Sequence, residues 1–214
     1  MNRIIIIGAG GHAKVVAELL RLSGKYEIIG FLDSALVGKK IGGFPVLGGD
    51  ELLPRLLADG VSLAFIGVGG TGDNLPRMKI FERVSALGFT FANAIHPSVI
   101  ISDSAHLGQG IAVMARAVIN PDAEIGDNVI INTGAIVEHD CKIGAHVHVS
   151  PGVVLCGGVR VGVAAHIGAG ATIRQNIIIG ERAVVGAGAV VVKDVPADSV
   201  VAGVPARIMR EADK

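Results

Sequence analysis

The sequence predicts a two-part chain, a small α/β unit followed by a parallel β-helix, and two observations carry this prediction. From Ile101 to Val191 every sixth residue is Leu, Ile or Val, over sixteen positions without an insertion. Before this repeat, strand patterns alternate with helical patterns, which is typical of a short parallel sheet. We expect the change near residues 92–100 and assign residues 1–95 and 96–214 to the two parts.

The α/β unit opens with IIIIGAGGHAKVVAELL (residues 4–20), which predicts a buried strand over 3–7, a glycine turn and a helix over 11–23. YEIIGFLD predicts a second strand that ends at Asp33. After FPVLGG, expected to be a turn, a second helix begins with Asp50 as its N-cap. SLAFIGVGG predicts a third strand, and NLPRMKIFERVSALG predicts a helix with Pro76 in its first turn.

The glycine turn matches a dinucleotide fingerprint, although its context differs. Gly8, Gly10 and Ala13 fit G-x-G-x-x-[G/A], and Asp33 follows about twenty residues later. However, only about 90 residues precede the repeat, which is too few for the two halves of a full Rossmann fold. His12 is also bulkier than such turns normally allow. We therefore expect not NAD but a phosphate or pyrophosphate at the helix N-terminus, with a turn that holds no ligand as the alternative.

A period of six residues indicates one short strand and one turn per repeat. Three repeats close a coil of eighteen residues, and successive coils stack at about 4.8 Å. The aliphatic residue points inward, and a small or apolar residue four positions later fits beside a turn. Cys141 occupies that second position, so we expect it to be a packing residue, and Cys156 shares no stack with it. Two unpaired cysteines favour a cytoplasmic protein.

Charge and hydropathy exclude several classes of partner. The chain has 19 Lys+Arg and 19 Asp+Glu and no basic tract, so a nucleic-acid or membrane-surface partner has no electrostatic support. No apolar run approaches the roughly 18 residues of a membrane span. The first apolar run is too short for a signal peptide and leads directly into a turn.

Several segments together resemble the NeuD/PglD-type sugar acetyltransferases of the hexapeptide-repeat superfamily. These are the turn GAGGHAKVV, the strand end FLD, the segment AIHPSVIIS, the uninterrupted hexapeptides and the closing VVAGVPARIMR. The resemblance covers essentially the whole chain. It implies a left-handed β-helix, whereas general crossover rules favour right-handed connections. It also implies acetyl-CoA as co-substrate, no metal, and a homotrimer with active sites between subunits.

The same resemblance assigns roles in IVEHDCKIGAHVHVSPG and beyond. His139 matches the catalytic base and Asp140 the carboxylate that orients it; an outward imidazole beside a carboxylate suits general-base catalysis. His148 matches a contact to acetyl-CoA near its thioester. Ala169 and Ala187, eighteen residues apart, match contacts along the pantetheine arm.

For the acceptor, the resemblance implies a nucleotide-linked sugar held by the α/β unit. The matching residues are Gly10, Gly11, His12, Asp33, Ser34 and Gly67. Ser34 stands where some relatives carry a second acidic residue, which leaves the nucleobase open. The implied reaction is direct acetylation of the 4-amino group of a UDP- or GDP-linked 4-amino-4,6-dideoxy sugar in bacterial glycan biosynthesis.

Three alternatives remain open at this point. The same histidine would serve O-acetylation of sialic acid or another sugar. A zinc-dependent hydratase of the γ-carbonic-anhydrase type shares the β-helix but needs three converging histidines, for which His146, His148 and His166 are the candidates. A non-catalytic nucleotide-binding protein is the third alternative.

Overall fold

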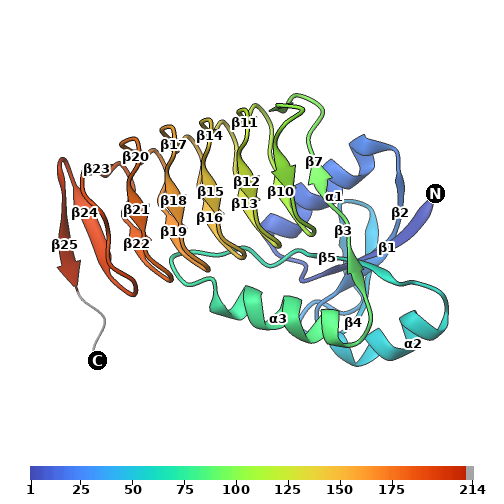
Figure 1. Ribbon diagram of the computed structural model, residues 1–214. Helices are drawn as coiled ribbons and strands as arrows, with labels where there is room; N and C mark the ends of the chain where they lie inside the picture. Colours follow the sequence, from blue (N-terminus) through green and yellow to red (C-terminus); the bar gives the residue numbers. More distant parts are fainter. Residues whose placement is uncertain (211–214) are drawn as a thin grey trace.

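The computed structural model describes residues 1–210 and confirms the two-part fold, with an α/β unit at one end of a three-sided left-handed β-helix (Figure 1). We call the β-helix the prism. None of the helices in the described residues has the length and apolar character required to cross a membrane.

The α/β unit is built on a six-stranded sheet of order β3-β4-β2-β1-β5-β6. Its strands are β1 (Asn2–Ile7), β2 (Tyr26–Leu32), β3 (Lys40–Ile41), β4 (Phe44–Gly48), β5 (Leu63–Ile66) and β6 (Thr90–Phe91). Ile4 and Ile6 of β1 pack with helix α1 (Gly11–Ser23), while Ile5 and Ile7 pack on the opposite face. That face is covered by the 3-10 turn η1 (Asp50–Leu52) and the helices α2 (Leu53–Ala58) and α3 (Leu75–Ala86).

Two local expectations for this unit are wrong. The segment FPVLGG is not a turn, because residues 44–48 form β4, which pairs in parallel with the open edge of β2. Five residues are too few for periodicity to separate a strand from a turn. Asp50 is not a helix N-cap either: Gly49 precedes η1, and the Asp50 carboxylate instead accepts a hydrogen bond from Arg83.

The prism consists of three parallel sheets, which we name by what their outer faces present. The covered sheet faces the α/β unit and contains β7 (Ala94–Ile95), β10 (Ala112–Val113), β13 (Ile130–Ile131), β16 (His148–Val149), β19 (His166–Ile167), β22 (Val184–Val185), β24 (Val200–Gly203) and the antiparallel β25 (Ala206–Arg210). The apolar sheet contains β8 (Ile100–Ile101), β11 (Val118–Ile119), β14 (Ile136–Val137), β17 (Val154–Leu155), β20 (Thr172–Ile173) and β23 (Val190–Val191). The charged sheet contains β9 (His106–Leu107), β12 (Glu124–Ile125), β15 (Lys142–Ile143), β18 (Arg160–Val161) and β21 (Ile178–Ile179).

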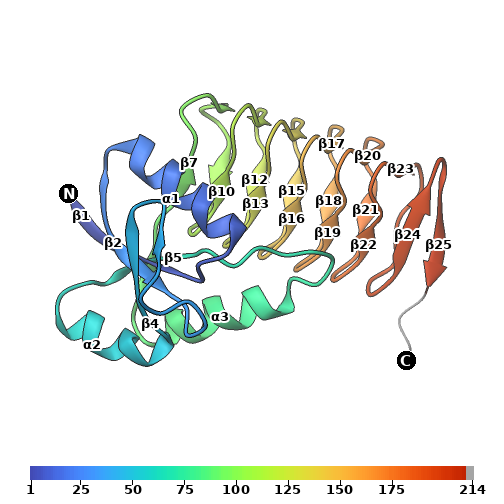
Figure 2. The ribbon, with the colours of Figure 1, turned by 180° about the vertical axis from the view of Figure 1, so that it is seen from behind.

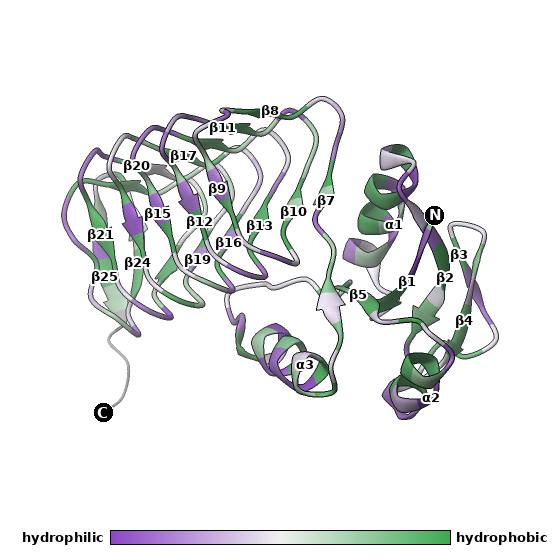
Figure 3. Ribbon diagram, turned by 45° about the vertical axis from the view of Figure 1, so that its right-hand side comes forward, coloured by the Kyte–Doolittle hydropathy of each residue, from purple (hydrophilic) through white to green (hydrophobic). Residues whose placement is uncertain are grey.

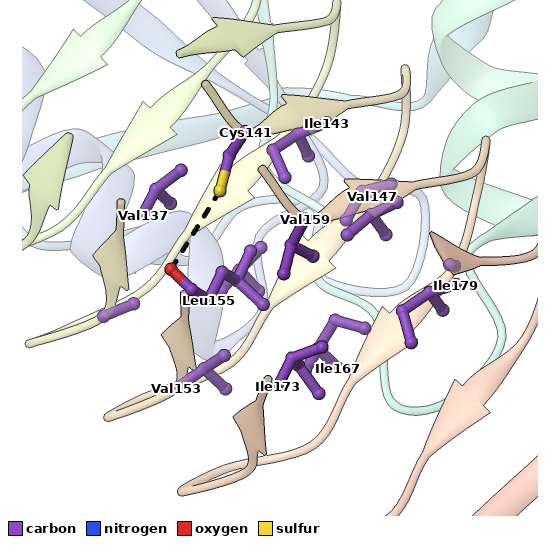
Figure 4. Close-up of a cluster of buried hydrophobic side chains, with 14 of the residues drawn as sticks. Val137, Cys141, Ile143, Val147, Val153, Leu155, Val159, Ile167, Ile173 and Ile179 are labelled. Atoms are coloured by element: carbon purple, nitrogen blue, oxygen red, sulfur yellow. Dashed lines mark hydrogen bonds between the residues drawn. The ribbon is translucent and has the colours of Figure 1, made fainter. Parts of the chain in front are cut away.

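The prism interior is filled by the predicted aliphatic column. Each pairing is in an eighteen-residue register, as in Val118 with Ile136, so inward side chains stack coil upon coil. Figure 4 shows this packing around Val137, Leu155 and Ile173. Cys141 is fully buried in the stack, and its Sγ lies 3.2 Å from the Cys156 carbonyl oxygen. The structure thus confirms Cys141 as a packing residue.

The α/β unit is fixed to the prism by both of its long helices. Residues of α1 share one apolar cluster with Ala94, Ala112 and Ile130 of the covered sheet. Helix α3 runs alongside the coils in both ribbon views (Figures 1 and 2). Just before it, the Asn74 amide donates to the Ala164 and Ala165 carbonyls. These contacts hold the glycine turn of α1 against the prism.

Candidate active site

A cavity of about 680 Å³ lies where the glycine turn meets the covered sheet. Its lining comes from residues 8–12, 15, 33, 67–71, 114, 132, 133 and 148. The carboxyl ends of β1, β2 and β5 meet here, which is the edge where open α/β sheets bind ligands. Five of the six residues predicted to hold the nucleotide sugar line this cavity, whereas Ser34 is exposed and outside the lining.

The N-terminus of α1 opens into this cavity without a capping side chain. Gly10 is the N-cap, no side chain bonds to the first turn, and that turn has no acidic residue. A Cβ at Gly10 or Gly11 would meet no atom within 4 Å, so open space lies in front of the turn. By contrast, a Cβ at Gly67 would lie 2.7 Å from Ile6 Cγ2, so only glycine allows this close approach. Unbonded N–H groups at a helix N-terminus favour an anion.

Asp33 fixes the shape of the turn. Its Oδ2 accepts a hydrogen bond from the Ala9 N–H at 3.1 Å, and its Oδ1 accepts one from the Ala35 N–H at 3.0 Å. Each carboxylate oxygen has a second lone pair, so Asp33 can still accept a bond from a ligand hydroxyl. The residue can therefore both build the cavity and contact its ligand.

His148 forms part of the prism wall of the cavity. Its Nδ1 donates to the Gly70 carbonyl at 2.9 Å, and its Nε2 accepts from the Asn132 amide at 3.1 Å. The pKa of His148 is lowered to about 4, mainly by burial and secondly by the nearby His166. The neutral ring thus ties the loop after β5 to the prism. Its expected contact with acetyl-CoA stays a prediction.

His12 has a different environment in the same cavity. Its pKa is lowered to about 3, mainly by burial and then by the charge of Arg77 and by His148. Its Nε2 is buried and has no hydrogen-bond partner among residues 1–210. At neutral pH the cavity is therefore lined by two neutral imidazoles, of which His12 has a ring nitrogen free for a ligand.

The predicted pantetheine contacts continue from this cavity along one corner of the prism. We call it the alanine corner, the column between the covered and apolar sheets that contains Ala115, Thr133, Pro151, Ala169 and Ala187. Thr133 lines the cavity, and Ala169 and Ala187 are exposed two and three coils further on. At strand spacing this places them roughly 10 and 14 Å along the axis. The cavity and the predicted cofactor path therefore share one surface of one chain.

His139 and Asp140 lie on a different corner, between the apolar and charged sheets, which we call the histidine corner. The His139 side chain is 62% exposed, and its Nδ1 lies 2.7 Å from Asp140 Oδ2. Asp140 has the left-handed φ of 60° that ends the turn. On the next coil, a Cβ at Gly157 would lie 2.6 Å from His139 Nε2, so glycine leaves room for the ring.

The electrostatics of this pair suit a general base. The hydrogen bond to Asp140 raises the pKa of His139 above its ordinary value; burial opposes this, and the charges of Asp140 and Glu138 add to it. The carboxylate therefore stabilises the imidazolium that forms when Nε2 accepts a proton. With Nδ1 bonded to Asp140, Nε2 is the nitrogen available to a substrate.

The histidine corner also carries two basic residues that the sequence did not single out. Arg174 and Lys193 line a second cavity of about 560 Å³. Lys193 stands three coils from His139 in the same column, since the two are 54 residues apart. That eighteen-residue arithmetic could have identified it. Two cations farther along the corner of the proposed base suit the phosphate groups of an extended cofactor whose reactive end lies near His139.

Other arrangements find less support in the described residues. Within residues 1–210, no three His, Cys, Asp or Glu side chains are grouped so that they could hold a metal. His146 Nδ1 is already bonded to the Asn128 amide, and the His148 and His166 rings meet edge to face at 5.0 Å. Within the described residues of one chain, the three candidate histidines of the zinc hydratase alternative therefore do not converge on one point. Burial raises the pKa of the Cys141 thiol to about 11, which disfavours a nucleophile there.

Comparison with known proteins identifies matches to both parts of the chain. Residues 3–84 match the PglD N-terminal domain, and residues 122–157 match the bacterial transferase hexapeptide (six repeats). UDP-N-acetylbacillosamine N-acetyltransferase of Bacillus subtilis (strain 168) is 39% identical over 119 residues, which are 54% of this chain and 52% of that relative. The match thus spans about half the length of this curated relative.

Solved structures match over nearly the whole chain. Perosamine N-acetyltransferase from Caulobacter crescentus, a variant with one histidine replaced by asparagine in complex with CoA and GDP-perosamine, is 44% identical with a TM-score of 0.93, covering 99% of this chain and 98% of that one. The acetyltransferase domain of PglB from Neisseria gonorrhoeae FA1090 is 44% identical with a TM-score of 0.92, covering 98% and 100%. WeeI from Acinetobacter baumannii AYE is 29% identical with a TM-score of 0.83, covering 96% and 99%.

Proposed function

The chain belongs to the hexapeptide-repeat sugar N-acetyltransferases, and from this premise we propose that it acetylates the 4-amino group of a UDP- or GDP-linked 4-amino-4,6-dideoxy sugar with acetyl-CoA. The near-complete match to an enzyme whose structure holds CoA and GDP-perosamine supports this substrate class. N-acetylation is favoured over O-acetylation because the bacillosamine and perosamine relatives are both N-acetyltransferases. The reaction would serve bacterial glycan biosynthesis in the cytoplasm.

The observation that carries the proposal is the His139–Asp140 pair, exposed on its corner above the bare Gly157. His139 Nε2 takes a proton from the attacking amine, and Asp140 holds the opposite nitrogen. The amine nitrogen bonds to the thioester carbonyl carbon, and the C–S bond breaks as the tetrahedral intermediate collapses. The proton on His139 then passes to the leaving thiolate of CoA, which restores the base. No acyl-enzyme is required.

The cavity at the α1 N-terminus suits the nucleotide part of the acceptor. The unbonded N–H groups near Gly10 and Gly11 would donate hydrogen bonds to the diphosphate. Asp33 would accept a hydrogen bond from a ribose or base hydroxyl or amine, and the free Nε2 of His12 would bond to the ligand. Ser34, exposed outside the lining, would be reached only by a ligand that extends over the rim.

One chain does not bring His139 to this cavity, which supports a site shared between copies. His139 is absent from the cavity lining and belongs to the corner opposite the covered sheet. The alanine corner and the histidine corner border the apolar sheet on its two sides. Three copies arranged with their apolar sheets toward a common axis would therefore bring each alanine corner next to a neighbour's histidine corner.

The outer face of the apolar sheet supports this trimer. Its outward residues are Ile100, Val118, Ile136, Val154, Thr172 and Val190, whereas the charged sheet presents His106, Glu124, Lys142, Arg160 and Ile178. Figure 3 shows the contrast, with hydrophobic colour on β8 and hydrophilic colour on β12 and β15. The side chain at the end of this face, Ile100, is 66% exposed. A contiguous apolar face of this kind is typical of an interface.

An activity panel tests the reaction. Purified protein would be given acetyl-CoA with GDP-perosamine, a UDP-linked 4-amino sugar, the corresponding free amino sugar and free sialic acid, and release of CoA would be followed. We expect release with a nucleotide-linked amino sugar and none with the free sugars. Release with sialic acid alone would contradict both the nucleotide cavity and N-acetylation.

Complementation tests the shared site. His139→Ala removes the base, and Gly10→Phe fills the open space at the turn; each variant alone should be inactive. Mixed trimers would be formed by co-expressing the two variants or by refolding them together in equal amounts. They should show about a quarter of wild-type activity, because half of the cavities and half of the bases are intact and the two combine at random. No recovery in verified mixed trimers would mean that each chain uses its own His139.

A further inference from the structure

Arg77 is a buried cation at the junction of the α/β unit and the prism. It lies in the first turn of α3, directly after the loop that forms one wall of the nucleotide cavity. Only 1% of its surface is exposed. Its Nη1 donates to the Asn128 carbonyl on the prism, which fixes the guanidinium between the two parts.

The charge of Arg77 has no partner of opposite sign. Within residues 1–210 no carboxylate forms a salt bridge with it, and its Nε and Nη2 have no hydrogen-bond partner. Burial lowers the pKa of Arg77 to about 9, which leaves it charged at neutral pH. A buried charge without a counter-charge destabilises the folded protein. A bound anionic ligand would compensate this charge.

The field of Arg77 reaches two walls of the cavity. His12 and His148 both line it, and the charge of Arg77 lowers the pKa of each. Among the described residues of the lining there is no Lys or Arg. Within one chain, a bound diphosphate would therefore be neutralised by backbone N–H groups and by this buried cation.

We propose that Arg77 is the buried counter-charge for the diphosphate of the nucleotide-linked acceptor, selecting for that group without touching it. The inference rests on the proposed function, since it requires a nucleotide in the cavity. In an interior of low dielectric, a cation acts across several ångströms far more strongly than in water. Substrate binding would thereby offset the electrostatic cost that Arg77 imposes on the free protein.

The test measures calorimetric affinities of full-length protein for GDP, GMP and guanosine, and for UDP, UMP and uridine. Arg77→Met keeps the apolar stem and removes the charge. It should weaken binding of the preferred nucleoside diphosphate by about tenfold or more, the monophosphate less, and the nucleoside not at all. Arg77→Lys should retain most of the preference for the diphosphate. Arg83→Met is the matched control, an exposed arginine of the same helix, and should change none of the affinities.

The outcomes separate this inference from the proposed function. If Arg77→Met weakens all three ligands of a series equally, Arg77 is only structural and the inference is wrong. If the Met variant does not fold, the Lys variant decides: loss of the diphosphate preference in folded Arg77→Lys overturns the inference. If wild-type protein binds no nucleotide of either series, the assignment of the cavity fails and this inference fails with it.

Discussion

His139 and His148 stand on two regions of the same prism, and their surroundings give them opposite protonation behaviour. His139 is on an exposed corner, where a carboxylate raises its pKa. His148 is on the covered sheet, where burial lowers its pKa to about 4 and both ring nitrogens are bonded within the chain. Each stands where the repeat directs a side chain outward.

This difference shows that the prism determines whether a side chain points outward, and that the α/β unit determines whether an outward histidine can exchange protons. An outward residue on an uncovered corner keeps access to solvent and substrate, so it can exchange protons. The same outward direction on the covered sheet leads into the α/β unit, where a histidine becomes a neutral link to the Gly70 loop. Four predictions test this contrast, from the largest expected effect to the smallest.

The first prediction separates the two histidines by kinetics. His139→Ala should reduce kcat by about 10³-fold, because general-base catalysis typically contributes 10²–10⁴-fold, and should leave nucleotide affinity unchanged. His148→Ala should instead weaken nucleotide binding, because the Gly70 loop loses its link to the prism. Steady-state rates and calorimetry check both.

The control for this pair is His106→Ala, an exposed histidine on the charged sheet. It should match wild type in rate and affinity. Near-normal kcat in His139→Ala would contradict the assignment of His139 as the general base.

The prism could be predicted almost completely from sequence, because each coil repeats the same six-residue pattern of one strand and one turn. One inward aliphatic every six residues fixes the register, so the positions of Cys141 inside and His139 outside follow from arithmetic. Handedness did not follow from the repeat and came from resemblance. Arg174 and Lys193 were missed, although the same arithmetic places them on the corner of His139.

The α/β unit could be predicted only in outline, because its site depends on contacts between distant segments. The glycine turn and Asp33 were found from local pattern, and both line the cavity. The strand β4 was missed, since its place depends on the open edge of β2. Nothing in the sequence signalled that Arg77 would be buried where it bonds to the Asn128 carbonyl, because burial there arises from docking α3 onto the prism.

The second prediction uses pH to probe the covered region. The pKa of His148 is about 4 and that of His12 about 3 in the folded protein, against about 6.5 when unfolded. The unfolded chain therefore binds more protons below pH 6.5, so stability is full above 6.5 and falls as pH decreases toward 4. At pH 5 each of the two histidines should lower the free energy of unfolding by about 2 kcal/mol relative to its value above pH 6.5.

Urea unfolding at pH 7, 6 and 5 and fixed protein concentration checks this. His148→Gln should lower stability at pH 7 and flatten the dependence on pH, whereas His106→Gln should leave the slope unchanged. An equally steep slope in His148→Gln would mean that other groups control acid unfolding.

The third prediction concerns the far end of the exposed corner. Replacing both Arg174 and Lys193 by Ala should raise the KM for acetyl-CoA by about tenfold at low salt, because two phosphate contacts are lost. The KM for acetyl-pantetheine, which lacks the nucleotide phosphates, should not change. Arg160→Ala on the charged sheet is the control. Equal increases for both thioesters would indicate a distorted corner rather than a phosphate site.

The smallest expected effect is a shift in the pH profile on replacing Asp140 by Asn. In the wild type the raised pKa of His139 means that the base stays protonated, and inactive, up to a higher pH than an ordinary histidine would. Asn accepts the left-handed φ of 60° at this turn, so the corner should keep its shape while the charge disappears. The pKa of His139 should fall, and the acid limb of kcat/KM should move to lower pH.

The amine of the acceptor also titrates, but its contribution is the same for both proteins, so the difference between their profiles isolates His139. The rate on the alkaline plateau should fall several-fold at the same time, because the imidazolium formed during attack is less stabilised without the carboxylate. Glu138→Gln, which removes only a more distant charge, should move the limb in the same direction by less. If the acid limb stays in place in Asp140→Asn, it reports a group other than His139. The proposed difference in protonation between His139 and His148 would then have no kinetic support.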